Sequence, residues 1–343
     1  MDGSVCGAAL FVSAAAGAWA AGGALGAPSP VPAVPDVVAV VYEHGGRSRA
    51  RSATGGWQLG RWCPSWTAAA HGAAVSAVRD AIAAGDVYQA TIVGHASAPY
   101  RGSPAPALRR VAGLPGARYG GILASGPTSA PGGTADRWAL ACASPETLVE
   151  VRAGRATTRP IKGTRPATAA GRAELLASAK ERAEHVMIVD LERNDVARVA
   201  RTGSVRVDTL YAVRRWCDLW QAESEISAEL APGTDLAALL RATCPGGSVT
   251  GAPKLAALDV IAAAEPVGRG PSMGALGWVC ADGIDLGLTI RTVAADAHRV
   301  HLWAGGGITW GSDPTAEVAE AAAKAAPVRA ALAGADRTGP TGR

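Results

Sequence analysis

The chain has 343 residues, 48% of them apolar and 18% charged, so it can bury a sizeable core in one large domain or two ordinary ones. Its net charge of +4 is small and its basic residues are scattered, which argues against a nucleic-acid-binding protein. The six cysteines lie far apart with no C-x-x-C pair, so neither a disulfide framework nor a zinc site is expected.

The N-terminal stretch is uncharged and rich in alanine and glycine. Residues 3–35 carry no charge and mimic a signal peptide, but no basic residue precedes them, and glycine and proline interrupt the apolar run. A secretory or membrane-spanning segment would need a basic flank and a denser apolar run. We therefore expect a cytoplasmic protein without membrane contact, whose N-terminus is poorly ordered or forms an edge strand.

Short strands and turns are predicted for the first half of the chain. An apolar run predicts a strand at residues 37–42, and Gly45-Gly46 predicts a hairpin turn after it. The elements that follow are a helix at 68–84 ending at Gly85, a strand at 87–93, a short helix at 104–112, and strands at 138–143, 147–151 and 155–160.

The second half of the chain alternates between helical and extended segments. In chain order we predict a mostly helical stretch at 169–199, a strand at 203–207, helices at 236–243 and 253–264, strands at 275–281, 285–295 and 300–304, and a long alanine-rich helix at 314–332. Because no regular βαβ repeat occurs, this order indicates a large α/β or α+β domain with antiparallel sheets covered by helices. Residues 333–343 are expected to form a frayed, disordered tail.

Lysine is rare, since only four of the 33 basic residues are lysine, at positions 162, 180, 254 and 324. Arginine cannot lose its proton in a protein, so a retained lysine hints at a need for a compact or neutral amine. Lys162 lies in the segment R-P-I-K-G-T-R-P (residues 159–166), with Arg165 as a nearby cation. A lysine whose pKa is lowered by desolvation or a nearby cation can act as a nucleophile. The alternative is a solvated lysine at a strand end.

Carboxylates recur at helical spacing in two segments. Glu184 lies at the edge of an apolar run, three residues after Glu181, so it is either salt-bridged or a ligand for a hard cation. Glu317 and Glu320 share a helical face with Lys324 and could complete a magnesium site with Glu184. As plain structure, the same residues are charged pairs on helix surfaces.

Two glycine-rich segments remain. Gly305, Gly306 and Gly307 follow a predicted strand, where exposed backbone N–H groups can hold a carboxylate or phosphate; otherwise they form a tight turn. The segment C-P-G-G-S-V-T-G-A-P-K (residues 244–254) opens a helix but lacks the P-loop order, so no nucleotide site is expected.

Taken together and in this order, these segments resemble the chorismate-utilising enzymes, which include anthranilate synthase component I, aminodeoxychorismate synthase component I, isochorismate synthase and salicylate synthase. The resemblance covers residues 74–332 and includes G-D-V-Y-Q (85–89), P-G-G-S-V-T-G-A-P-K (245–254) and I-R-T (290–292). It implies an α+β fold of two stacked antiparallel sheets flanked by helices. Residues 1–73 would be a strand-rich, variable part of that fold, and residues 74–332 the chorismate-binding catalytic domain.

Within this family the residue after Pro-Ile separates the reactions. The chain has P-I-K-G-T, as aminodeoxychorismate synthases do, whereas anthranilate synthases have P-I-A-G-T. The resemblance therefore implies that Lys162 attacks C2 of chorismate and expels the 4-hydroxyl group, after which ammonia enters at C4. Gln89 stands where water-using members have a basic lysine, which fits an ammonia-using enzyme on a p-aminobenzoate, folate or secondary-metabolite route.

The resemblance also assigns the remaining site residues. Glu146 would be the general acid that protonates the departing hydroxyl. Glu184 and Glu320 would bind Mg²⁺, with Glu317 contributing directly or through water, and the metal would hold the ring carboxylate. Substrate contacts are expected from Thr164, Gln221, Lys254, Ser272, Arg291, Thr292, Gly305, Gly306, Gly307 and Lys324.

The resemblance also implies a glutamine amidotransferase partner that supplies ammonia. No glutaminase-like Cys/His segment is recognisable here, so the nitrogen is expected from another chain or from free ammonia. The chain departs from the family pattern where Q-A-E-S (221–224) replaces H-L-V-S, and where Ser272 replaces a tyrosine in R-G-x-Y-x-G-A. These departures leave two alternatives open. One is a different chorismate conversion, of the anthranilate or aminodeoxyisochorismate type. The other is a catalytically impaired homologue that binds or scaffolds an amidotransferase.

Overall fold

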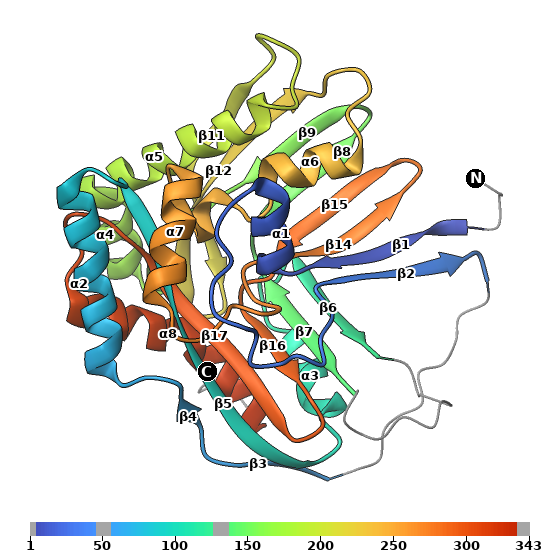
Figure 1. The fold of residues 1–343 in the computed structure, drawn as a ribbon, viewed down its shortest axis with the longest axis vertical. Helices are drawn as coiled ribbons and strands as arrows, with labels where there is room; N and C mark the ends of the chain where they lie inside the picture. The colour runs from blue at the N-terminus through green and yellow to red at the C-terminus, as the bar shows by residue number, and fades with distance from the viewer. Residues whose placement is uncertain (1–4, 46–55, 126–136, 335–343) are drawn as a thin grey trace.

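The computed structural model describes residues 5–45, 56–125 and 137–334. Within these ranges the chain forms two antiparallel sheets that pack face to face, with helices around them (Figure 1). The main apolar cluster combines Leu148 and Leu286 of one sheet with Leu140 and Trp303 of the other. The predicted fold class, α+β with stacked antiparallel sheets, is confirmed.

The first sheet has nine strands. Its order is β10 (Ile161–Pro166), β12 (Leu219–Glu229), β9 (Arg155–Arg159), β8 (Thr147–Arg152), β15 (Gly283–Leu288), β14 (Ala275–Cys280), β1 (Val5–Val12) and β2 (Val37–Glu43), with β11 (Arg206–Trp216) also paired to β12. Strands from both ends of the described chain therefore meet in one sheet, because β1 pairs with β14.

The second sheet has eight strands. Its order is β13 (Gly251–Ala252), β5 (Gln89–Gly102), β17 (Arg299–Ile308), β16 (Thr292–Ala295), β7 (Ala139–Ser144) and β6 (Tyr119–Ala124), with β3 (Trp57–Leu59) and β4 (Cys63–Pro64) also paired to β5. The long strands β5 and β17 run side by side for ten residue pairs. The C-terminal helix packs against β17.

The helices of the described chain are α1 (Ala14–Ala21), α2 (Ala68–Ala84), α3 (Ala105–Ala112), α4 (Ala169–Ala177), α5 (Ala179–Ala197), α6 (Leu236–Thr243), α7 (Lys254–Ala264) and α8 (Pro314–Ala333). Side-chain caps begin two of the three helices that carry predicted site residues, whereas α7, which carries Lys254, begins at Pro253 without one. The Ser178 side chain accepts from Glu181 N at the start of α5, and Asp313 accepts from Ala316 N at the start of α8. None of the described helices is both long and apolar enough to cross a membrane.

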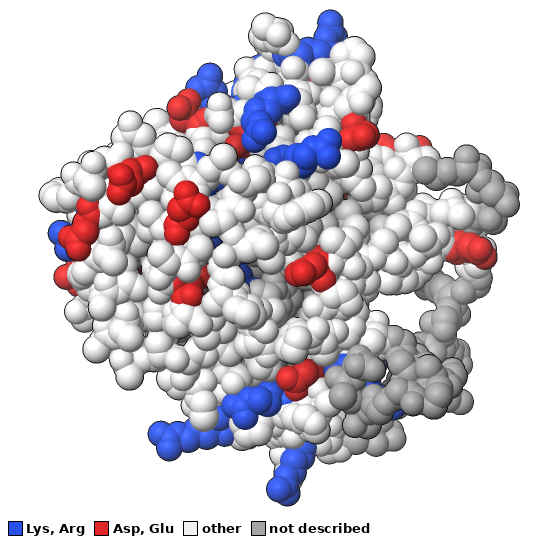
Figure 2. Space-filling view, viewed as in Figure 1, with Lys and Arg blue, Asp and Glu red and all other residues white. Residues whose placement is uncertain are grey.

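Charged side chains occupy a small part of the face seen in Figure 2. Acidic and basic groups both occur there, and most of the visible surface is uncharged. This matches a chain in which only 18% of residues are charged.

The N-terminal segment differs from its prediction. β1 lies between β14 and β2 rather than at a sheet edge, and Phe11 is fully buried. An uncharged apolar segment fits an interior strand because both of its faces are covered. The predicted strand at 37–42 is confirmed as β2, which forms the edge instead. Gly46 of the predicted hairpin turn lies outside the described residues, as do residues 335–343 of the predicted tail.

Two further strand predictions were wrong. The hairpin of β11 and β12 was missed except for its first residues, because charged side chains such as Arg214 and Glu223 interrupt its apolar pattern. The single strand predicted at 285–295 is two strands in different sheets, β15 and β16. The chain changes sheet at residues 289–291, where Arg291 adopts a φ of +53°.

Candidate active site

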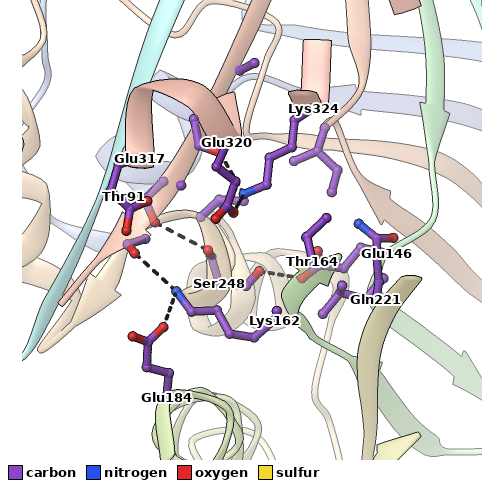
Figure 3. A pocket seen from close by; sticks show the side chains of 18 of the residues that line it. Thr91, Glu146, Lys162, Thr164, Glu184, Gln221, Ser248, Glu317, Glu320 and Lys324 are labelled. Atoms are coloured by element: carbon purple, nitrogen blue, oxygen red, sulfur yellow. Dashed lines mark hydrogen bonds and ion pairs between the residues drawn. The ribbon is translucent and has the colours of Figure 1, made fainter. Parts of the chain in front are cut away.

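A cavity of about 110 Å³ lies where β10, β17, α5 and α8 meet. It has room for several water molecules, each of which needs roughly 10–15 Å³. In Figure 3, Lys162 and Glu184 point toward each other, while Glu317, Glu320 and Lys324 project from α8 on the opposite side. The predicted site residues that line it are Glu146, Lys162, Thr164, Glu184, Gln221, Arg291, Gly305, Gly306, Gly307, Glu317, Glu320 and Lys324.

Lys162 reaches the cavity from an irregular part of β10. The pairing with β12 shifts register between Lys162 and Thr164, and Gly163 between them has a φ of +86°. A side chain on Gly163 would also meet Leu175 and Glu181, so only glycine fits. Lys162 Nζ lies 3.5 Å from Glu184 Oε2 and 3.4 Å from Gly307 O, and the lysine side chain is 12% exposed. The alternative of a solvated lysine at a strand end is therefore wrong.

The glycine triplet lies inside β17, not after a strand as predicted. Gly305, Gly306 and Gly307 pair with Val93, Ile92 and Thr91 of β5.

Their lack of a side chain makes room for the site. A Cβ on Gly307 would lie 2.5 Å from Lys162 Nζ and 2.9 Å from Gln89 Nε2. The glycines thus allow other side chains to approach the strand closely.

Gln89 is fully buried beside Lys162. Both polar atoms of its side chain, Oε1 and Nε2, lack a hydrogen-bond partner among the described residues. An unpaired buried amide costs free energy, and a bound polar ligand or water can supply the missing partner. Gln89 does not line the cavity itself. Its amide and the amine of Lys162 nevertheless both lie close to the point that a Cβ on Gly307 would occupy.

Glu146 is buried between the two sheets, just after β7. Its Oε1 accepts a 2.5 Å hydrogen bond from Ser248 Oγ. Burial raises the pKa of Glu146 to about 7, although the Ser248 hydrogen bond and the charge of Arg291 oppose this shift. A carboxyl group with this pKa can hold and release a proton near neutral pH, as a general acid must.

The three predicted metal ligands line the cavity but are engaged with protein groups. Glu184 Oε1 accepts from Thr309 Oγ1 at 2.7 Å, and Glu317 Oε1 accepts from Ser312 Oγ at 2.6 Å. Glu320 Oε1 lies 2.5 Å from Lys324 Nζ, and this charge lowers the pKa of Glu320 to about 2. Burial, by contrast, raises the pKa of Glu317.

Among the described residues, no three His, Cys, Asp or Glu side chains are gathered as a metal site. The chemistry of the donor set nevertheless suits a hard cation, since all three groups are carboxylates. Glu317 Oε2 and Glu320 Oε1 both lie within 4 Å of the point that a Cβ on Gly306 would occupy. Magnesium binding stays a prediction.

Arg291 offers a positive charge to the cavity. Its guanidinium is 4.6 Å from the centre of the Trp216 ring and donates from Nη1 to Lys324 O at 3.1 Å. Its buried Nε has no partner among the described residues, and burial lowers the pKa of Arg291 to about 10. No protein carboxylate forms an ion pair with Arg291 in the described chain, so its guanidinium can bind the carboxylate of a ligand.

The family model for chorismate binding enzymes matches residues 33–330. This chain belongs to that family. The resemblance inferred from the sequence motifs is therefore confirmed.

Relatives of this chain carry two different names. Anthranilate synthase component 1 of Streptomyces coelicolor is 40% identical over 267 residues, 76% of this chain and 50% of that protein. Aminodeoxychorismate synthase component 1 of Klebsiella aerogenes is 37% identical over 243 residues, 69% of this chain and 52% of that protein. The chain thus spans about half the length of these curated relatives.

The fold of this family member agrees with a solved structure. Anthranilate synthase component I from Streptococcus pneumoniae TIGR4 superposes with a TM-score of 0.79 and 26% identity, covering 95% of this chain and 81% of that chain.

Three residues predicted to bind substrate do not line the cavity. Lys254 Nζ forms a buried ion pair with Asp195 Oδ2 at 2.7 Å. Thr292 donates its hydroxyl to Ile290 O at 3.1 Å, and Ser272 donates to Thr289 O at 3.3 Å. Ser272 itself is therefore no part of the cavity lining, whereas Gln221 is part of it.

Sequence reasoning missed several lining residues, of which Ser248 is the most informative. It holds Glu146, and it lies in the glycine-rich loop that begins at Cys244, where a hydroxyl residue between glycines was a usable signal. The other lining residues not predicted are Thr91, Ile161, Gly163, Lys180, Glu181, Val249, Met273, Ile290, Trp303 and Ala304.

Proposed function

We propose that this chain aminates chorismate at C4, forming 4-amino-4-deoxychorismate with ammonia from a glutamine amidotransferase partner. The observation that carries the proposal is the place of Lys162, whose amine faces the cavity beside Gly307 and Glu184. A lysine at this position of the P-I-K-G-T segment is the feature that separates aminodeoxychorismate synthases from anthranilate synthases in the family resemblance.

In the proposed first step Lys162 forms a bond from Nζ to C2 of chorismate. The ring double bond shifts, the bond between C4 and its hydroxyl oxygen breaks, and Glu146 gives its proton to the departing oxygen, so water leaves. Burial keeps the pKa of Glu146 near 7, which lets the group enter this step protonated.

In the proposed second step ammonia forms a bond to C4, the double bond shifts back, and the bond from Nζ to C2 breaks. A proton from the new ammonium group returns to Glu146, so the enzyme is restored. Overall, one ammonia is consumed, one water is released, and an amino group replaces the hydroxyl group at C4. The unpaired amide of Gln89, next to Lys162, can accept a hydrogen bond from the incoming ammonia.

The carboxylates of the substrate would be held by positive groups around the cavity. Arg291 offers an unpaired Nε, and the neighbouring Lys324, whose backbone oxygen accepts from Arg291 Nη1, also lines the cavity. Glu184, Glu317 and Glu320 would hold Mg²⁺, which would neutralise a substrate carboxylate and act as a Lewis acid. Glu184 also contacts the amine of Lys162, so it would orient the nucleophile.

The proposal is tested by incubating the protein with chorismate, Mg²⁺ and ammonium and identifying the product by mass spectrometry. We expect 4-amino-4-deoxychorismate, and no product from Lys162→Ala. Lys180→Ala is the matched control, because Lys180 also approaches Glu184, at 3.7 Å, from a more exposed position. It should lose far less turnover. Unchanged turnover in Lys162→Ala would contradict the role of this lysine.

A second candidate is the synthesis of anthranilate. The name of the Streptomyces coelicolor relative, which is 40% identical, supports it. In that case the same incubation yields anthranilate and leaves no aminodeoxychorismate. A chain that turns over no chorismate in the presence of ammonium would instead favour the scaffold alternative.

A further inference from the structure

A second cavity lies on the other side of α8 from the candidate active site. Its volume of about 380 Å³ falls within the roughly 300–1,000 Å³ typical of small-molecule sites. Ala321 and Ala325 of α8 line this cavity, whereas Glu320 and Lys324 line the candidate active site. Of all the lining residues, the two cavities share only Ala304. The second cavity is therefore a separate space.

Aromatic faces form one wall of this second cavity. Trp62 and Trp66 precede α2, and the Trp66 ring stacks on His71 with centroids 4.8 Å apart and planes 19° apart. Gly94 of β5 leaves room for the stack, because a Cβ there would lie 3.1 Å from Trp66 Nε1. Flat indole faces favour a planar ligand.

Arg329 supplies the positive charge. Its guanidinium lies 5.0 Å from the centre of the Trp62 ring, and its buried Nε has no hydrogen-bond partner among the described residues. No ion pair involves Arg329 in the described chain, and no Asp or Glu lines the cavity there. Burial lowers the pKa of His95 to about 3 and also lowers the pKa of His71, so both rings are neutral at neutral pH. The cavity thus presents one uncompensated cation beside aromatic surface.

We propose that this cavity binds a small planar aromatic carboxylate, with its ring against Trp62 and Trp66 and its carboxylate on Arg329. A guanidinium matches a carboxylate with two parallel hydrogen bonds, and stacking on the indole leaves its edge free to donate them. The small side chains of Ala321 and Ala325 leave the opposite wall open to the ring.

Isothermal titration with benzoate and with benzamide tests the proposal, because the two probes share a ring and differ in charge. We expect saturable benzoate binding and benzamide binding that is at least about tenfold weaker. Arg329→Gln should reduce benzoate affinity to the benzamide level. Arg79→Gln is the matched control, since Arg79 also lies over a tryptophan, at 5.9 Å, with an unpaired Nε, but outside the cavity.

A variant that fills the cavity separates this site from any other. Ala322 lines the cavity and is exposed on α8, so Ala322→Leu should keep the fold, as checked by circular dichroism, and abolish the binding of both probes. Benzoate affinity that survives both Arg329→Gln and Ala322→Leu places the ligand elsewhere and overturns the proposal. Equal affinity for benzoate and benzamide, or no benzoate binding at all, overturns it too.

Discussion

Lys162 and Lys254 both face a carboxylate in the interior, but their surroundings differ. Lys162 Nζ lies 3.5 Å from Glu184 Oε2 at the wall of a cavity, and these side chains are 12% and 13% exposed. Lys254 Nζ lies 2.7 Å from Asp195 Oδ2, neither residue lines that cavity, and these side chains are 8% and 4% exposed. The looser pair can exchange partners with a ligand, while the tighter pair holds α7 to α5. An identical residue type therefore lines a cavity in one region and joins two helices of the core in the other.

The largest expected effect comes from removing the lysine at the cavity. Lys162→Ala should lower turnover of chorismate with ammonia by about a thousandfold or more, because it removes the amine that would form the covalent bond. The free energy of unfolding, measured in urea, should change little, since Glu184 keeps its hydrogen bond from Thr309. If Lys162→Ala instead lowers the free energy of unfolding strongly and leaves turnover at the wild-type level, Lys162 has a structural role and not a catalytic one.

The opposite pattern is expected for the second lysine. Lys254→Met should lower the free energy of unfolding by about 3 kcal/mol, because Asp195 would remain buried without its partner. Urea denaturation measures this loss. Adding Asp195→Leu should recover much of it, since replacing both charges removes the unpaired carboxylate. If Lys254→Met leaves stability unchanged but abolishes turnover, Lys254 belongs to the site after all.

Glu146 extends the comparison to a buried carboxyl group. Its pKa is raised from 4.5 to about 7. The ionisation of Glu146 therefore destabilises the folded state increasingly as pH rises from 4.5 to about 7 and fully above it. At lower pH the group is protonated in both the folded and the unfolded state. Glu146→Gln should therefore raise the free energy of unfolding by up to about 3 kcal/mol at mildly alkaline pH, and hardly at all at acidic pH. The same change should lower turnover about a hundredfold, because the general acid is lost. A variant that is equally stabilised at both pH values would contradict the raised pKa.

The smallest effect is expected at the residue that holds this carboxyl group. Turnover should fall as pH rises through the pKa of Glu146, because the acid must be protonated. The Ser248 hydrogen bond lowers that pKa, so Ser248→Ala should raise it and move the alkaline fall of the pH–rate profile to higher pH. The loss in turnover at the pH optimum should stay near tenfold. A fall that moves to lower pH would show that Ser248 does not act through Glu146.

Much of the fold and of the site was predictable from local patterns. The helices α2, α5 and α8 each begin at a side-chain cap, and the family motifs around Glu146, Lys162 and Glu320 suggested a role for each of these residues. The β11–β12 hairpin was not predictable in this way, because charged side chains interrupt the alternation of apolar and polar residues that marks a strand. The interior position of β1 depends on β14, more than 250 residues away in the chain.

The amino-acid sequence by itself determined the family and many of the side chains that line the candidate active site, since those depend on residue type at fixed spacing. Only the tertiary structure decided which side chains meet. Lys254, Thr292 and Ser272 lie in motifs as marked as that of Lys162, yet their polar groups are satisfied inside the core. Position 307 on β17 needs glycine because the amine of Lys162, which extends from β10 of the other sheet, occupies the space that a side chain would fill. Such contacts join segments far apart in the chain, and no local pattern records them.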